Sequence, residues 1–102
     1  MTDNPLTEQQ ITELGLADWN FDTGADGDAI HGDFHRGTFT AAGAFAAQVS
    51  SIADRMDHHP SIDISYPDLV RVRSSSHDAG GVTDRDVQLA TAISEAAGAA
   101  TG

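Results

Sequence analysis

The middle of the chain, residues 45–60, reads FAAQVSSIADRMDHHP, and it decides how the rest of the sequence is interpreted. Its apolar residues recur at spacings of four, three and four, as expected for the buried stripe of a helix. They are Phe45, Val49, Ile52 and Met56. Pro60 cannot continue a helix, because its ring fixes φ and removes the backbone donor. The adjacent histidines His58 and His59 are therefore expected at a rigid helix exit.

On the amino-terminal side of this helix, the sequence predicts one more helix and two strands. Thr7 and Gln10 have the spacing of a capping box, and Gly15 suits the left-handed residue that ends a helix. Alternation of apolar and polar residues predicts strands at 16–21 and 29–36, joined by an acidic turn that contains glycine. Thr40 is expected to cap the central helix.

On the carboxyl-terminal side, alternation predicts strands at 62–66 and 69–76 around a Pro67-Asp68 turn. The later strand has valines on one face and arginines on the other, which is typical of a sheet with one solvated face. Thr83 is expected to open the last helix. The order αββαββα predicts an α+β fold, with three helices packed on one face of a four-stranded antiparallel sheet.

The length of 102 residues predicts one domain, residues 1–102, with fraying at 1–5 and 98–102. The sequence has neither an apolar run of about 18 residues nor a basic and apolar leader, so we expect a cytoplasmic protein that does not enter membranes. The absence of cysteine excludes disulfides, thiol catalysis and thiolate metal sites.

The chain is strongly acidic, with 16 acidic residues against five arginines and a formal net charge of −11. This charge would repel nucleic acid. The composition fits a proteome adapted to high salt, where counterions screen the self-repulsion, and the alternative is a GC-rich genome that favours Asp and Arg codons. On either interpretation the acidic composition bears on the solubility of the protein and not on any reaction it carries out.

The histidines are the candidate chemical groups, because imidazole both donates and accepts protons near neutral pH. Adjacent side chains diverge, so we do not expect His58 and His59 to face a ligand in the same way; the alternative for one of them is to cap the helix end. His77 follows a strand and alone would be an ordinary surface histidine. Asp86 has the spacing of a carboxylate that caps the last helix, and it can also serve the site.

A metal held by these three histidines and Asp86 is a further alternative. The sequence has no pair of histidines four residues apart on a helix and no His-Glu-x-x-His motif, and we assign no metal.

These residues together resemble the pterin-4a-carbinolamine dehydratases. The likeness extends from about residue 6 to residue 97 and is carried by Trp19, Phe39, Phe45, Asp54 four residues before His58-His59-Pro60, Tyr66, the block SHDAGGVT at 76–83, Asp86 and Leu89-Ala90. The sequence departs from the family at Ile62 and Arg36, which stand where many members carry aromatic residues.

The resemblance implies an enzyme without metal or cofactor that removes water from 4a-hydroxytetrahydropterins, giving quinonoid dihydropterin in tetrahydropterin recycling. It also implies a homodimer or homotetramer whose small-molecule partner is the pterin. By similarity the catalytic residues are His58, His59 and His77, and the residues that bind or support the substrate are Asp86, Asp54, Pro60 and Trp19. The alternative function is a non-catalytic binding or assembly protein on the same scaffold, such as a dimerisation cofactor or an enzyme assembly factor.

Overall fold

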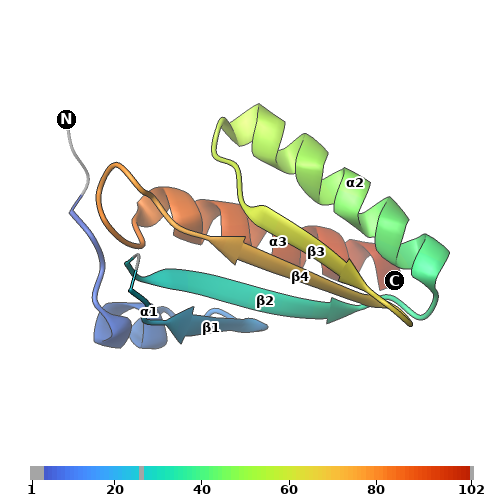
Figure 1. Ribbon diagram of the computed structural model, residues 1–102, viewed down its shortest axis with the longest axis horizontal. Coiled ribbons are helices and arrows are strands. Elements are labelled where there is room, and N and C mark those ends of the chain that lie inside the picture. Colours follow the sequence, from blue (N-terminus) through green and yellow to red (C-terminus); the bar gives the residue numbers. More distant parts are fainter. Residues whose placement is uncertain (1–3, 26, 102) are drawn as a thin grey trace.

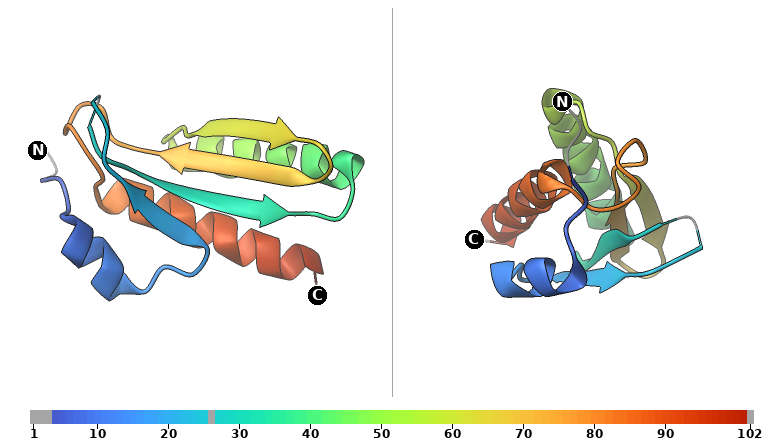
Figure 2. Two further views of the ribbon diagram at one scale, coloured as in Figure 1. Left: turned by 60° about the horizontal axis from the view of Figure 1, so that its bottom comes forward. Right: turned by 90° about the vertical axis from the view of Figure 1, so that its left-hand side faces the viewer.

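The computed structural model describes residues 4–25 and 27–101, with side chains as far as Gly98 (Figure 1). Its elements are α1 (Glu8–Leu14), β1 (Trp19–Asp22), β2 (Ala29–His35), α2 (Phe39–Met56), β3 (Ser61–Ser65), β4 (Leu69–Ser74) and α3 (Asp84–Thr101). The predicted αββαββα order is confirmed. The strands form one antiparallel sheet in the order β1-β2-β4-β3, with the helices on one side of it (Figure 2).

The predicted capping box opens α1. Thr7 Oγ1 accepts from the Gln10 backbone N–H at 3.1 Å, and Gln10 Oε1 accepts from the Thr7 N–H at 2.8 Å. Gly15, with φ of 63°, ends the helix as expected. The strand predicted to start at Leu16 begins only at Trp19, because Asp18 also has a positive φ, 76°, and keeps the intervening residues in a turn.

The central helix α2 begins two residues earlier than expected. Thr38, not Thr40, is the N-cap: its backbone is extended and its side chain accepts from the Ala41 N–H at 3.0 Å. Thr40 already lies within the first turn. The predicted apolar stripe is confirmed, since Phe45, Val49 and Ile52 are buried and Met56 packs against the same core.

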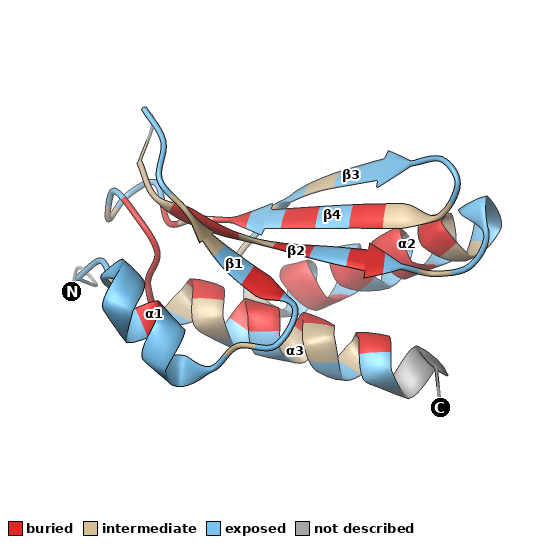
Figure 3. Cartoon of the chain, turned by 90° about the horizontal axis from the view of Figure 1, so that it is seen from below, coloured by how far each residue is buried: buried red, intermediate tan, exposed pale blue. Residues whose placement is uncertain are grey.

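Along the two central strands, β2 and β4, buried residues that face the core alternate with more exposed residues on the opposite face (Figure 3). Buried side chains of the core face include Ile30, Phe34, Val70 and Val72. On the opposite face Arg71 forms a two-pronged ion pair with Asp33, at 2.7 and 2.9 Å. The prediction of one solvated face is therefore confirmed.

Several expected boundaries were wrong. β2 ends at His35 and not at Arg36, and β3 runs from Ser61 to Ser65, leaving Tyr66 outside the strand and 86% exposed. β4 ends at Ser74, because Ser76 turns away to form an isolated bridge with Gly81.

The fraying expected at 1–5 and 98–102 stays a prediction. In the structure the helix α3 continues to Thr101. Near the other end, the Leu6 N–H donates to the Val82 carbonyl at 2.6 Å, which ties this segment to the loop before α3. Part of the predicted fraying, at residues 1–3 and 102, lies outside the described residues. Within the described ranges, no helix combines the length and apolarity needed to cross a bilayer.

Candidate functional site

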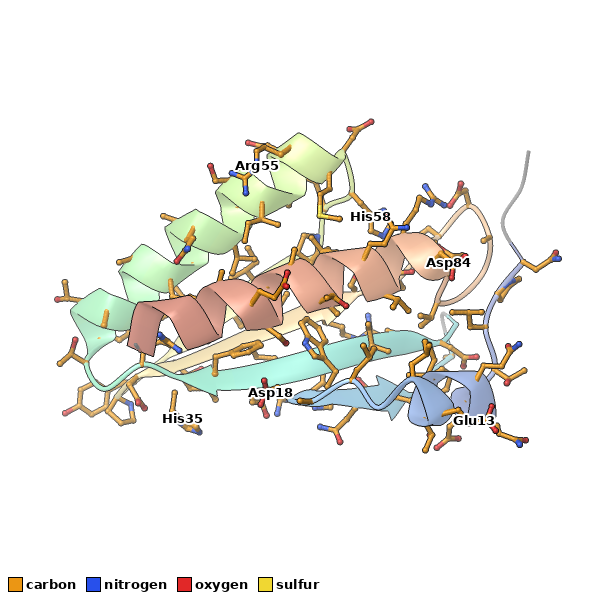
Figure 4. The ribbon with its side chains drawn as sticks, turned by 180° about the vertical axis from the view of Figure 1, so that it is seen from behind. Glu13, Asp18, His35, Arg55, His58 and Asp84 are labelled. Atoms are coloured by element: carbon orange, nitrogen blue, oxygen red, sulfur yellow. The ribbon has the colours of Figure 1, made fainter. Side chains whose placement is uncertain are left out.

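The candidate site lies where the C-terminal end of α2 approaches the N-terminal end of α3, and Figure 4 shows His58 between them, near Asp84. Three segments meet there: the loop after α2, the end of β4 and the first turn of α3. The antiparallel pairing of Ser61 with Arg73 explains the meeting, because it brings the start of β3 beside the end of β4. Residues that are distant in sequence are thereby joined at one end of the sheet.

Asp86 is the buried centre of this site. As the sequence predicted, it caps its own helix: Oδ2 accepts from the Thr83 N–H at 2.9 Å. The same oxygen accepts from Ser76 Oγ at 2.8 Å, while Oδ1 accepts from Ser74 Oγ and lies 2.7 Å from His58 Nε2. The side chain is fully buried, so its carboxylate acts on its protein neighbours and not on a ligand directly.

His58 is aimed at Asp86 by the way α2 ends. Asp57 adopts a left-handed conformation with φ of 51°, which turns the chain out of the helix. The His58 N–H still donates to the Ala53 carbonyl at 3.2 Å and fixes the backbone of this turn. The imidazole is 10% exposed, and among the described residues no group hydrogen-bonds its second ring nitrogen, Nδ1.

His59 points to a different partner. Its Nε2 lies 2.9 Å from Asp54 Oδ1, and both side chains are largely exposed. The two adjacent imidazoles therefore differ in environment: His58 is nearly enclosed by protein, whereas His59 is open to solvent. Pro60 follows them, partly buried, and leads into β3.

His77 lies in the short loop between Ser76 and Gly81. Its carbonyl accepts from the Gly80 N–H at 3.2 Å, and its side chain is exposed. The loop is fastened to α3 by Arg85, which donates to both oxygens of Asp78 at 2.9 and 3.1 Å and lowers the pKa of that carboxyl. His77 thus follows directly after Ser76, whose hydroxyl donates a hydrogen bond to the Asp86 carboxylate.

Trp19 is placed apart from the histidines. It is buried on the core side of β1, where its Nε1 donates to Ser94 Oγ at 2.9 Å and its ring meets Phe34 edge-on. Ser94 stands about 12 Å along α3 from Asp86, given the helical rise. A cavity of about 390 Å³ beside Trp19 is bordered by α1 and β1, not by the histidines.

Sequence reasoning did not find the roles of Ser74 and Ser76. Both hydroxyls are buried against the Asp86 carboxylate, yet in the sequence they belong to a plain Ser-Ser-Ser run. The available signal was alternation: Ser74 lies on the inward face of β4 with the valines, and Ser76, two residues further and past the strand, is buried as well.

The arrangement can hold and move protons. A nearly enclosed histidine on a buried carboxylate has a fixed orientation, and an exposed histidine beside it exchanges protons with solvent. Among residues 4–25 and 27–101, no group of three or more His, Asp or Glu side chains is placed to hold a metal ion.

Comparisons with known proteins give the site a context. A sequence profile described as "Pterin 4 alpha carbinolamine dehydratase" matches residues 4–96. A relative from Chloroflexus aggregans, provisionally named a pterin-4-alpha-carbinolamine dehydratase, is 40% identical over 95 residues, covering 91% of this chain and 97% of its own. A relative from Halobacterium salinarum with the same provisional name is 46% identical over 85 residues, covering 83% and 88%.

A solved structure shares the fold. The protein from Brucella melitensis described as "transcriptional coactivator/pterin dehydratase" superposes with a TM-score of 0.80 at 32% identity, covering 92% of this chain and 99% of its own.

Proposed function

The chain belongs to the pterin-4a-carbinolamine dehydratase family, and we propose that it removes water from 4a-hydroxytetrahydropterins to give quinonoid dihydropterin in tetrahydropterin recycling. The observation that carries the proposal is the His58–Asp86 pair, a histidine held by a buried carboxylate at a helix exit. A dehydration needs oriented proton carriers, and this pair supplies one without any further group.

The reaction requires a base to take the N5 proton and an acid to protonate the departing 4a-hydroxyl. We assign these two transfers to His58 and His59, which stand next to each other but differ in exposure. His77, exposed in the neighbouring loop, is assigned to substrate binding or proton transfer.

The remaining residues support the site in different ways. Asp86 and Asp54 each hold one histidine by a hydrogen bond, and Pro60 follows the pair and leads into β3. Trp19, with its indole N–H bonded to Ser94, is assigned a supporting role through the core.

The test is the rate of 4a-hydroxytetrahydropterin dehydration, followed by ultraviolet absorbance in low and high salt and with a chelator present. We expect turnover that survives the chelator and falls by at least roughly 100-fold in the double variant His58→Ala, His59→Ala. His35→Ala is the matched control, because this exposed histidine pairs with Asp68 on the solvated face of the sheet. A folded wild-type protein with no more activity than the double variant in either salt would disprove the proposal.

A second candidate is a binding or assembly protein, in keeping with the coactivator description of the Brucella protein. The observation that favours it is an exposed aromatic pair: Phe39 is 53% and Tyr66 86% exposed, with ring centroids 6.4 Å apart. Such rings are suited to contact with another protein or with a second copy in the homodimer or homotetramer that we propose for the cytoplasm. A stoichiometric protein partner recovered with a chain that shows no turnover would favour this candidate.

A further inference from the structure

In the hydrogen bonds around Asp86, only one choice of donor and acceptor at each contact gives every group a partner. A backbone N–H can only donate. The Thr83 N–H donates to Asp86 Oδ2, and the Arg85 N–H donates to Thr83 Oγ1 at 3.3 Å. The Thr83 hydroxyl lies 2.8 Å from Ser76 Oγ, and the Ser76 hydroxyl donates to Oδ2. Ser74 donates to Oδ1. Protons therefore point toward the carboxylate from three of its four partners, and the fourth is His58.

The contact between Asp86 Oδ1 and His58 Nε2 holds one proton. A carboxylate that accepts on both oxygens has no proton of its own to donate, so the shared proton is assigned to the ring nitrogen. The hydrogen bonds agree with this assignment, because Thr83, Ser76 and Ser74 already donate to the two carboxylate oxygens. With Nε2 protonated, the neutral ring keeps its lone pair on Nδ1.

We propose that Asp86 fixes His58 in the tautomer protonated at Nε2, so that Nδ1 is the atom that accepts the substrate N5 proton, and that Ser74 and Ser76 are positioning residues for this pair. The reaction step rests on the proposed dehydratase function, whereas the tautomer does not. The serines act through the carboxylate, since both are buried and bonded to it.

The proton balance of the step follows from this geometry. His58 Nδ1 takes the proton of N5, and the electron pair of that N–H bond allows N5 to form a double bond to C4a. The C4a–oxygen bond breaks with its electron pair going to oxygen, which takes a proton from His59 and leaves as water. Exchange with solvent then returns a proton to His59 and removes one from His58.

The first test is nitrogen NMR of the wild-type protein labelled with ¹⁵N-histidine, without substrate and above the titration range of the imidazoles. We expect one ring with a persistent Nε2–H signal that is missing in His58→Gln, while the exposed His59 shows averaging between tautomers. A His58 ring protonated at Nδ1, or one averaged like His59, would overturn the proposal. The ring can also be assigned in the wild-type protein by correlation with its own backbone N–H, so loss of folding in His58→Gln cannot obscure the result.

The second test compares Ser74→Ala with Ser74→Thr, which retains the hydroxyl. We expect kcat to fall about tenfold in Ser74→Ala with KM unchanged, because a charge-assisted hydrogen bond is lost away from the substrate. Ser74→Thr should recover most of the loss. Unchanged kcat in a folded Ser74→Ala, or a change in KM alone, would contradict a positioning role. An Nε2–H signal in a protein without turnover would leave the tautomer intact and remove the proposed function.

Discussion

Replacing Asp86 with alanine should strongly destabilise the protein, and the size of the effect follows from the hydrogen bonds that end on its carboxylate. The Thr83 N–H has a fixed direction, and leaving such a buried donor unsatisfied costs about 1–3 kcal/mol. The imidazole of His58 loses its partner at a similar cost of about 1–3 kcal/mol. The hydroxyls of Ser74 and Ser76 can rotate, so we count no further loss for them. The sum, about 2–6 kcal/mol, is a large part of the roughly 5–15 kcal/mol that keeps a domain folded.

Urea denaturation of wild type, Asp86→Ala and Asp86→Asn measures this loss as a free energy of unfolding. The asparagine variant is the matched control, because its amide oxygen still accepts from Thr83 and it should therefore lose less than alanine. A loss below about 1 kcal/mol in Asp86→Ala, at an unchanged m-value, would show that the carboxylate does not hold this end of the fold together.

Three further changes test other parts of the structure. In Gly32→Ala the added Cβ would lie 2.9 Å from the Phe34 ring, so thermal unfolding should show a loss of about 1–3 kcal/mol; an unchanged midpoint would refute this overpacking. Asp57→Gly should raise the free energy of unfolding in urea by up to about 1 kcal/mol, because it relieves a positive φ of 51°, and a destabilised variant would contradict that. The hydrogen bond from His35 lowers the pKa of Asp68 in the folded protein. The ionised carboxylate therefore stabilises the fold fully above about pH 4, the pKa of Asp in the unfolded chain, and this stabilisation is lost as the pH falls through the lower pKa of the folded state. Asp68→Asn should therefore be less stable than wild type at neutral pH, with the difference in urea denaturation disappearing in acid; a difference that persists in acid would have another cause.

The features that the sequence predicted well depend on neighbours in the chain. The capping box of Thr7 and Gln10 and the left-handed Gly15 are local, so their residue types suffice. Thr38 and Thr40 show the limit of local reasoning, since both can cap a helix and only the extended backbone at Thr38 decides between them.

The arrangement of the site depends on contacts that sequence spacing does not reveal. The helix-capping role of Asp86 was predictable because Thr83 is close in the chain. Its bonds to Ser74 and His58 were not predictable from spacing, because they require the end of β4 and the exit of α2 to meet at the start of α3. The resemblance to the family identified the candidate histidines, but it did not show which carboxylate each of them contacts.

The order of the strands has a consequence for how the site comes into being during folding. β2 and β4 pair at the centre of the sheet, joining Ile30 with Ser74 across much of the chain, and such non-local pairings form slowly because a long loop must first close. The partners of Asp86 are assembled by that same closure. A chain that has formed α1 and α2 but not the central strand pair can hold the local His59–Asp54 pair but not the His58–Asp86 pair. The His58–Asp86 pair should therefore appear only once β2 and β4 have paired, so the onset of turnover during refolding should report on that pairing.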